Sequence, residues 1–247
     1  MTILDLSARG LSTWPDEPIR DAGPASITEL NLWRNGIEEV PRDVASLAAL
    51  EVLVLADNRL TALPPEVGAL PCLHTLDVGH NQLVSVPDEV GELAAMRRCL
   101  YLHDNRLTTL PPSLFRLSEL DYLNVGENPL GVLPEEIEGL EGLRELHVER
   151  AGLESLPDSL GGLAKLRELH LRDNALRVLP RSLERLGALR RLDLRGNPLE
   201  ELPSWLVALP ALQKLDLRWV ARCAPREAAR REPLLEALHA NGCHVLR

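Results

Sequence analysis

Aromatic residues are scarce in this chain: Phe, Tyr and Trp together make up 3% of its 247 residues. A core of this length that lacks aromatic side chains needs one small packing solution used many times, which predicts an internal repeat. Basic residues are also in the minority, 27 against 37 acidic ones, and the net charge is -10. A general nucleic-acid binder needs a clustered basic surface, so we expect no nucleic-acid partner.

Long hydrophobic runs are missing too. The longest nearly uncharged stretch lies around residues 205–212, where Pro210 interrupts it, and it is far too short to span a bilayer. The N-terminal residues do not combine a basic segment with an apolar stretch, as a secretory signal peptide would. We therefore expect a cytoplasmic protein with no membrane partner. Export by a specialised secretion system stays open as an alternative.

Cysteine is rare and its spacing is not that of a metal site. The four residues are scattered along the chain, at Cys72, Cys99, Cys223 and Cys243. Reduced, mostly buried thiols of a cytosolic protein are the expected state. A disulfide between Cys223 and Cys243 near the C-terminus is the alternative.

Leucine, in contrast, accounts for more than one residue in five, and it follows a period. The period is marked by asparagines spaced 23, 23, 24, 23, 46 and 23 residues apart, and the interval of 46 is two periods with Ala151 at the missing position. Around each marker the chain approximates LxxLxLxxNxLxxLPxxLxxL, as between Leu166 and Leu186. The markers are Asn35, Asn58, Asn81, Asn105, Asn128, Asn174 and Asn197.

This pattern resembles the leucine-rich repeat family, in the 23-residue class of Ras-group and Scribble-type proteins and of many bacterial proteins. The resemblance covers residues 1 to about 220, with a degenerate copy at each end. It implies an α/β solenoid in the form of a curved horseshoe, with parallel strands on the concave face and short helical or irregular segments on the convex side. The typical function of the family is protein recognition, so the resemblance also implies a protein partner.

Elementary physics predicts the same architecture. The alternation in LxLxx is typical of a short strand with alternate side chains inward. The asparagine falls in the buried turn that follows, where backbone groups need hydrogen-bond partners, and a side-chain amide is both a donor and an acceptor. Stacked asparagines can therefore join neighbouring turns in a ladder, and the proline fixes the start of the returning segment.

The pattern also sets the expected boundaries. Residues 1–26 form a degenerate first repeat and an end loop, since residues 16–26 have no leucine period. Residues 27–220 form the leucine-rich repeats, and residues 221–247 form a C-terminal cap. In the cap we expect a short helix over 232–240 with Pro233 in its first turn, Gly242 after its end, and a last short strand.

The residues between the strand leucines should face the concave side and form the usable surface. Its N-terminal half is small, apolar and aromatic, whereas its C-terminal half is densely charged. Aromatic and arginine side chains are the usual hot spots of interfaces. The alternative is that the charges form a solvated face and the valines only favour strands. The candidate partner-binding residues are Trp33, Val54, Tyr101, His103, Tyr122, His147, Glu149, His170, Arg172, Asp193, Arg195 and Arg218.

One pair in this set invites a chemical interpretation. His147 and His170 occupy the same position of consecutive repeats, so they should lie about 5 Å apart. Two imidazoles and a carboxylate can bind zinc, and the carboxylates around this pair are Glu145, Glu149, Glu168 and Asp193. A solvated histidine pair among charges of both signs is the simpler interpretation, so we expect no metal. The chain also lacks P-loop, GxGxxG, HExxH and GxSxG motifs, and we expect no cofactor and no catalytic site.

The sequence thus predicts a non-enzymatic protein–protein interaction module, a monomeric scaffold or adaptor that binds a protein on its concave face. The family resemblance adds a Ras-like GTPase as one class of partner. The alternative is a secreted bacterial effector of the leucine-rich-repeat ubiquitin-ligase type. Such effectors carry a separate catalytic domain after the repeats, and here only the 27 cap residues follow.

Overall fold

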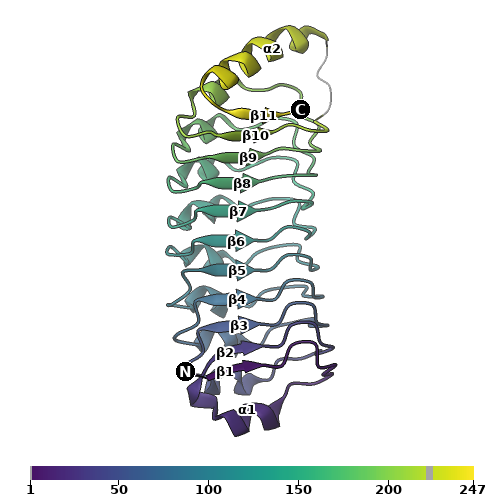
Figure 1. Ribbon diagram of the computed structural model, residues 1–247, viewed down its shortest axis with the longest axis vertical. Coiled ribbons are helices and arrows are strands. Elements are labelled where there is room, and N and C mark those ends of the chain that lie inside the picture. The colour runs from purple at the N-terminus through teal and green to yellow at the C-terminus, as the bar shows by residue number, and fades with distance from the viewer. Residues whose placement is uncertain (1, 221–224) are drawn as a thin grey trace. The chain divides into compact units, whose positions relative to one another are not determined.

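The computed structural model describes residues 2–220 and 225–247, which form two compact units, up to Asn128 and from Pro129 onward. In each unit the strands are parallel and follow one another in chain order (Figure 1). The first unit contains β1 (Thr2–Asp5), β2 (Ile27–Asn31), β3 (Val52–Val54), β4 (Thr75–Asp77), β5 (Cys99–Tyr101) and β6 (Tyr122–Asn124). The second contains β7 (Glu145–His147), β8 (Glu168–His170), β9 (Arg191–Asp193), β10 (Lys214–Asp216) and β11 (His244–Leu246).

The leucines of the strands set the register between repeats. Leu30 pairs with Leu53, and Leu53 pairs with Leu76, so that each central leucine lies beside its equivalent in the next strand. In the second unit Leu146 pairs with Leu169 in the same way. All of these side chains are fully buried, because one repeat cannot cover its own leucines but a stack of repeats can.

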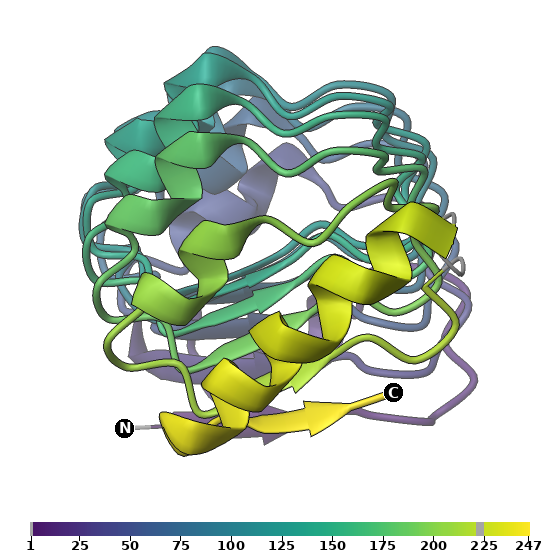
Figure 2. The same cartoon turned by 90° about the horizontal axis from the view of Figure 1, so that it is seen from above.

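The returning segments are short 3-10 turns. Each starts directly after a proline in the extended conformation, and in some of them the first residue of the turn is a second proline. Seen from above, the turns lie on the side away from the strands (Figure 2). The expected α/β solenoid of leucine-rich repeats is confirmed. The turns are η2 (Arg42–Ser46), η3 (Pro65–Ala69), η4 (Asp88–Glu92) and η5 (Pro112–Arg116) in the first unit, and η6 (Glu135–Gly139), η7 (Asp158–Gly162), η8 (Arg181–Arg185) and η9 (Ser204–Ala208) in the second.

The repeated asparagines form a ladder of hydrogen bonds inside the turns. The amide Nδ2 of Asn174 donates to the carbonyls of Val148 and Leu171, at 2.7 and 3.0 Å. Its Oδ1 accepts the N–H groups of Ala151 and Leu153, both at 3.0 Å. Each such side chain therefore pairs backbone groups of its own repeat and of the preceding one. The donation from Nδ2 to a carbonyl of the preceding repeat recurs at Asn35, Asn58, Asn81, Asn105, Asn128 and Asn197.

The residue before each asparagine has a left-handed backbone, which the sequence pattern did not predict. The non-glycine residues at this position have φ values between 50° and 58°, and Gly196 has 69°. Left-handed backbone costs a residue with a Cβ atom roughly 1–2 kcal/mol, so it persists only where neighbouring bonds impose it. Backbone bonds between the turns do this, because the N–H of such a residue donates to a carbonyl of the next repeat, as that of Asp57 does to Gly79 at 3.0 Å. The non-glycine residues are Arg34, Asp57, His80, Asp104, Glu127 and Asp173, and Arg150 has the same conformation before Ala151.

The N-terminal end differs from the loop that the sequence suggested. Helix α1 (Asp16–Ala22) and the 3-10 turn η1 (Pro24–Ser26) occupy this segment. Ile19 is buried at 6% exposure, and Asp16 and Glu17 provide the acidic first turn that favours a helix N-terminus. A helix of seven residues with a single buried apolar side chain is too short to give a visible hydrophobic period.

The C-terminal cap is more helical than expected. Helix α2 (Pro225–Ala240) begins seven residues before the predicted start, so Pro233 lies inside it and not in its first turn. Leu235 and Leu238 are buried, and Gly242 follows the helix with a φ of 82°. The predicted last strand is β11, which pairs with β10.

The cysteines and the helices bear on two further expectations from the sequence. Cys223, and with it the alternative of a Cys223–Cys243 disulfide, lies outside the described residues, whereas Cys72 is an exposed free thiol and Cys243 a buried one. Over residues 2–220 and 225–247, the helices are all too short or too polar to cross a membrane.

Ala151, at the position without an asparagine, gives a direct test of the ladder. We expect Ala151→Asn to raise the free energy of unfolding by roughly 0.5–1.5 kcal/mol, the net value of a satisfied hydrogen bond. By the geometry of Asn174, the new oxygen would reach the N–H of Leu130, 21 residues earlier, as that of Asn174 reaches Leu153. Urea unfolding of the variant and the unchanged protein measures the difference. A variant less stable than the parent would contradict the prediction.

Candidate functional site on the strand face

The strand face is the set of side chains that alternate with the buried strand leucines and point away from the core. In β7, for example, Glu145 and His147 flank the buried Leu146, and both are only partly exposed. The same alternation recurs in β8, where Glu168 and His170 flank Leu169. Every candidate residue from the sequence analysis lies on a strand or in the turn directly after one.

In the first unit the strand face carries the aromatic residues. The rings of Tyr101 and Tyr122 lie 4.8 Å apart, and the ring of His103 lies 6.1 Å from that of Tyr101. Trp33 lies in the turn after β2, is 43% exposed, and has the guanidinium of Arg34 5.9 Å from its ring centre. The structure thus brings Tyr101, His103 and Tyr122 together and leaves Trp33 as a separate exposed aromatic.

His103 has a neighbour that the sequence analysis missed. The ring of His80 lies 4.7 Å from that of His103, edge to face, and its Nδ1 lies 2.6 Å from a carboxylate oxygen of Asp104. His80 and Asp104 both precede a ladder asparagine, one repeat apart, and that equivalence was available in the sequence. Burial and the charge of His80 lower the pKa of His103. This imidazole therefore stays neutral to lower pH than an exposed one.

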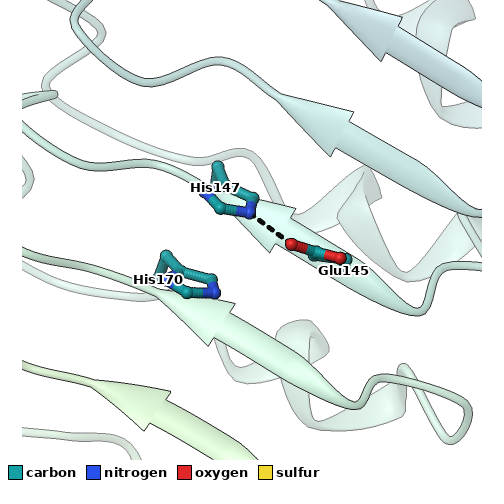
Figure 3. Close-up of side chains that lie close together, drawn as sticks. All are labelled: Glu145, His147 and His170. Carbon is teal, nitrogen blue, oxygen red and sulfur yellow. Dashed lines mark hydrogen bonds and ion pairs between the residues drawn. The ribbon is translucent and has the colours of Figure 1, made fainter. Parts of the chain in front are cut away.

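In the second unit the histidine pair is stacked. The rings of His147 and His170 are 4.0 Å apart and 7° from parallel, as expected from their shared register (Figure 3). Nε2 of His147 lies 2.7 Å from Oε1 of Glu145, and its Nδ1 lies 3.2 Å from Oε1 of Glu149. On the next strand, Nε2 of His170 lies 3.3 Å from Oε2 of Glu168.

The surroundings of the two imidazoles shift their pKa values in opposite directions. Burial alone lowers the pKa of His147, but the hydrogen bonds and charges of Glu149 and Glu145 outweigh it, and the pKa lies above its usual value. Burial and the neighbouring His147 lower the pKa of His170. Glu149 is partly buried, yet its hydrogen bond with His147 keeps the pKa of its carboxyl below the usual value. As pH falls, His147 therefore takes up the first proton of the pair.

Asp193 is buried beneath the strand face, where it holds Arg195 in place and is not exposed to a partner. Its carboxylate is 4% exposed and accepts both the backbone N–H and the guanidinium of Arg195. Asp216 holds Arg218 in the same way. The side-chain oxygen of an Asp or Asn at this strand position accepts the N–H two residues later, a local bond that fixes the strand exit. The other examples are Asp5, Asn31, Asp77 and Asn124.

The arginines of the second unit are consequently anchored but remain accessible. The side chains of Arg195 and Arg218 are 21% and 39% exposed. Arg172 is partly exposed, with its Nε 3.5 Å from Asp173. The guanidinium of Arg218 lies 5.6 Å from the ring centre of Trp219, which is 75% exposed. The face therefore presents fixed positive groups above buried carboxylates, beside an exposed aromatic side chain.

Comparison with known proteins establishes the family. The leucine-rich repeat family matches residues 25–90, 98–153, 142–199 and 165–219, which together make up well over half of the chain. The protein belongs to the leucine-rich repeat family. Proteins of this family are generally interaction modules that bind other proteins. No curated protein matches the sequence at a significant level.

Several solved structures share the fold. A leucine-rich repeat protein of Leptospira interrogans superposes with a TM-score of 0.84 at 27% identity, over 98% of this chain and 65% of its own. The leucine-rich repeat domain of the type III effector XopL gives a TM-score of 0.76 at 31% identity, over 91% of this chain and 77% of that domain. This chain thus spans slightly less than two thirds of the Leptospira protein.

One of the similar structures is a receptor that was solved as a complex. The ectodomain of a plant membrane receptor kinase from Arabidopsis thaliana, in complex with CASPARIAN STRIP INTEGRITY FACTOR 2, gives a TM-score of 0.59 at 27% identity. The similarity covers 83% of this chain and 31% of the receptor. A leucine-rich repeat structure similar to this one therefore forms a complex with the factor that its name states.

Proposed function

We propose that this chain is a non-enzymatic protein–protein interaction module, a monomeric scaffold or adaptor, whose strand face binds a protein partner. The observation that carries the proposal is the pair of exposed tryptophans, Trp33 and Trp219, one on each unit beside the strand face. Each has an arginine over its ring, from Arg34 and Arg218. Exposed aromatic and arginine groups are the side chains that most often dominate binding at protein interfaces.

The rest of the face supports a protein partner over a nucleic acid. Around the histidine pair the charged groups alternate in sign, as between Arg191 and Glu168, whose atoms lie 2.8 Å apart. A phosphate backbone would be repelled by Glu145 and Glu149, whereas a protein surface with charges of both signs can match them. A Ras-like GTPase is one such partner, and it enters this proposal from the family resemblance alone.

The similarity to the leucine-rich repeat domain of a type III effector favours a second candidate function. At 31% identity over 91% of this chain, the XopL domain supports a bacterial effector module that recognises a host protein. A translocation reporter fused to the chain and expressed in a bacterium with a type III secretion system separates the two. Delivery into host cells would favour the effector, and retention in the bacterium would favour a cytoplasmic adaptor.

The binding face is tested by removing the tryptophans one at a time. After affinity purification has identified a partner, we expect Trp33→Ala or Trp219→Ala to weaken its binding by about 30-fold or more, because a lost aromatic anchor typically costs about 2 kcal/mol. The matched control is Trp205→Ala in η9, on the side with the 3-10 turns. Binding that withstands both strand-face substitutions but is lost in the control would place the partner on the other side.

A further inference from the structure

The strand face of the second unit contains three potential metal ligands from two adjacent strands. One ligand atom each from Glu145, His147 and His170 can be chosen so that all three lie within 4.8 Å of one another. Glu145 and His147 are two residues apart on β7, and His170 is the register partner of His147 on β8 (Figure 3). The three side chains thus form a triangle on one face of the sheet. In the described part of the chain, no other three such side chains meet this closely.

The imidazoles are already oriented for this triangle. Nε2 of His147 faces Glu145, while its Nδ1 is bonded to Glu149 at 3.2 Å, and the same Glu149 oxygen lies 3.9 Å from Nδ1 of His170. Histidines that bind metals almost always donate their other N–H to a carboxylate, a backbone carbonyl or water, which fixes the tautomer and the ring. Glu149 occupies that supporting position for His147, and its oxygen lies beside Nδ1 of His170 beyond hydrogen-bond distance.

We propose that Nε2 of His147, Nε2 of His170 and the carboxylate of Glu145 bind one Zn²⁺ ion. Two imidazole nitrogens and one carboxylate oxygen form a ligand set that suits zinc, and hard cations such as Ca²⁺ prefer sites made only of oxygens. A tetrahedral site with bonds of about 2.0–2.1 Å keeps its ligand atoms roughly 3.3 Å apart, so the parallel rings must tilt toward each other. Zinc displaces the proton held between His147 and Glu145, and that proton passes to solvent.

The fourth position of the ion is open to solvent. Glu168 is a further carboxylate beside the site, 3.3 Å from Nε2 of His170, but its oxygen is also paired with Arg191 at 2.8 Å. That ion pair keeps Glu168 as a neighbour of the site and leaves the fourth position to water. The side chains of His147 and His170 are 17% and 14% exposed, so the ligands are shielded while the ion can still enter from the face.

Isothermal titration with ZnCl₂ tests the site in the full chain, made without a polyhistidine tag and with Cys72→Ser to remove the exposed thiol. We expect one Zn²⁺ per chain. His147→Gln and His170→Gln should each weaken binding by about 100-fold, and Glu145→Gln or Glu149→Gln by about 10-fold or more. Titration with CoCl₂ should produce the visible absorption of a tetrahedral site, whereas CaCl₂ and MgCl₂ should give no heat.

Two control variants separate this site from unspecific binding. Glu168→Gln removes the carboxylate that Arg191 retains, and His80→Gln removes one imidazole of the other histidine pair, which meets edge to face in the first unit. Both should leave zinc affinity within about 3-fold of the parent, since neither residue supplies a ligand or bonds the Nδ1 atom of a liganding imidazole. Circular dichroism and melting curves without metal verify that each variant is folded.

The possible results are decisive. Absence of heat with ZnCl₂ in the parent protein would overturn the proposal, and so would unchanged affinity in His147→Gln and His170→Gln. An equal loss in His80→Gln would show that zinc binds the histidines unspecifically. As a second measurement, zinc should raise the melting temperature of the parent but not of folded His170→Gln. None of these results depends on the proposed protein partner.

Discussion

Replacing Asn174 with alanine is expected to lower the free energy of unfolding by about 2–4 kcal/mol, because buried polar groups would lose their partners. The asparagine is 7% exposed and joins the N–H groups of Ala151 and Leu153 to the carbonyls of Val148 and Leu171. Each buried group left without a partner costs about 1–3 kcal/mol, and water that enters the gap recovers part of that cost.

Urea unfolding followed by circular dichroism measures this change. Asn241→Ala is the matched control in the same unit, because Asn241 is exposed and its amide donates one bond, to the carbonyl of Val207 at 3.1 Å. Its loss should change the stability by no more than about 0.5 kcal/mol. If Asn174→Ala cost no more than the control, the ladder would not be a stabilising feature of the fold.

A second large effect is expected at two adjacent glycines of η7. A Cβ atom at Gly161 would overlap the backbone carbonyl of Ser182 in the next repeat, whereas one at Gly162 would lie 3.5 Å from Cβ of Glu138, an ordinary contact. We therefore expect Gly161→Ala to destabilise the protein by about 2–3 kcal/mol, because the two repeats must move apart. Gly162→Ala should be neutral or slightly stabilising, since alanine restricts the unfolded chain.

The two alanine variants differ by one position and share the same chemistry, so the comparison isolates the contact between η7 and η8. Their midpoints in a urea titration should separate clearly, with Gly161→Ala below the parent and Gly162→Ala at or above it. Equal midpoints would mean that the repeats can separate at this side without cost. Loss of stability in Gly162→Ala alone would indicate that the register of η7 is one residue out.

Periodicity predicted most of the backbone and one element of the site. A leucine that recurs every 23 residues must meet its equivalent in the next repeat, so the parallel strands and the proline-initiated turns followed from the sequence. The same argument placed His147 beside His170, because residues at one position of consecutive repeats become register partners. Segments outside the period, such as Asp16–Ala22, gave no such information. The structure shows that this segment is a helix.

The sequence by itself determined which residues are repeated and therefore which of them become neighbours. Only the tertiary structure decided how those neighbours bond. Asp193 bonds the backbone and the guanidinium of Arg195, and Nε2 of His147 faces Glu145. The residue before each ladder asparagine has a left-handed backbone. The physical reason is that a repeat fixes spacings along the stack, whereas side-chain direction depends on the partners that the surrounding strands bring within hydrogen-bond distance.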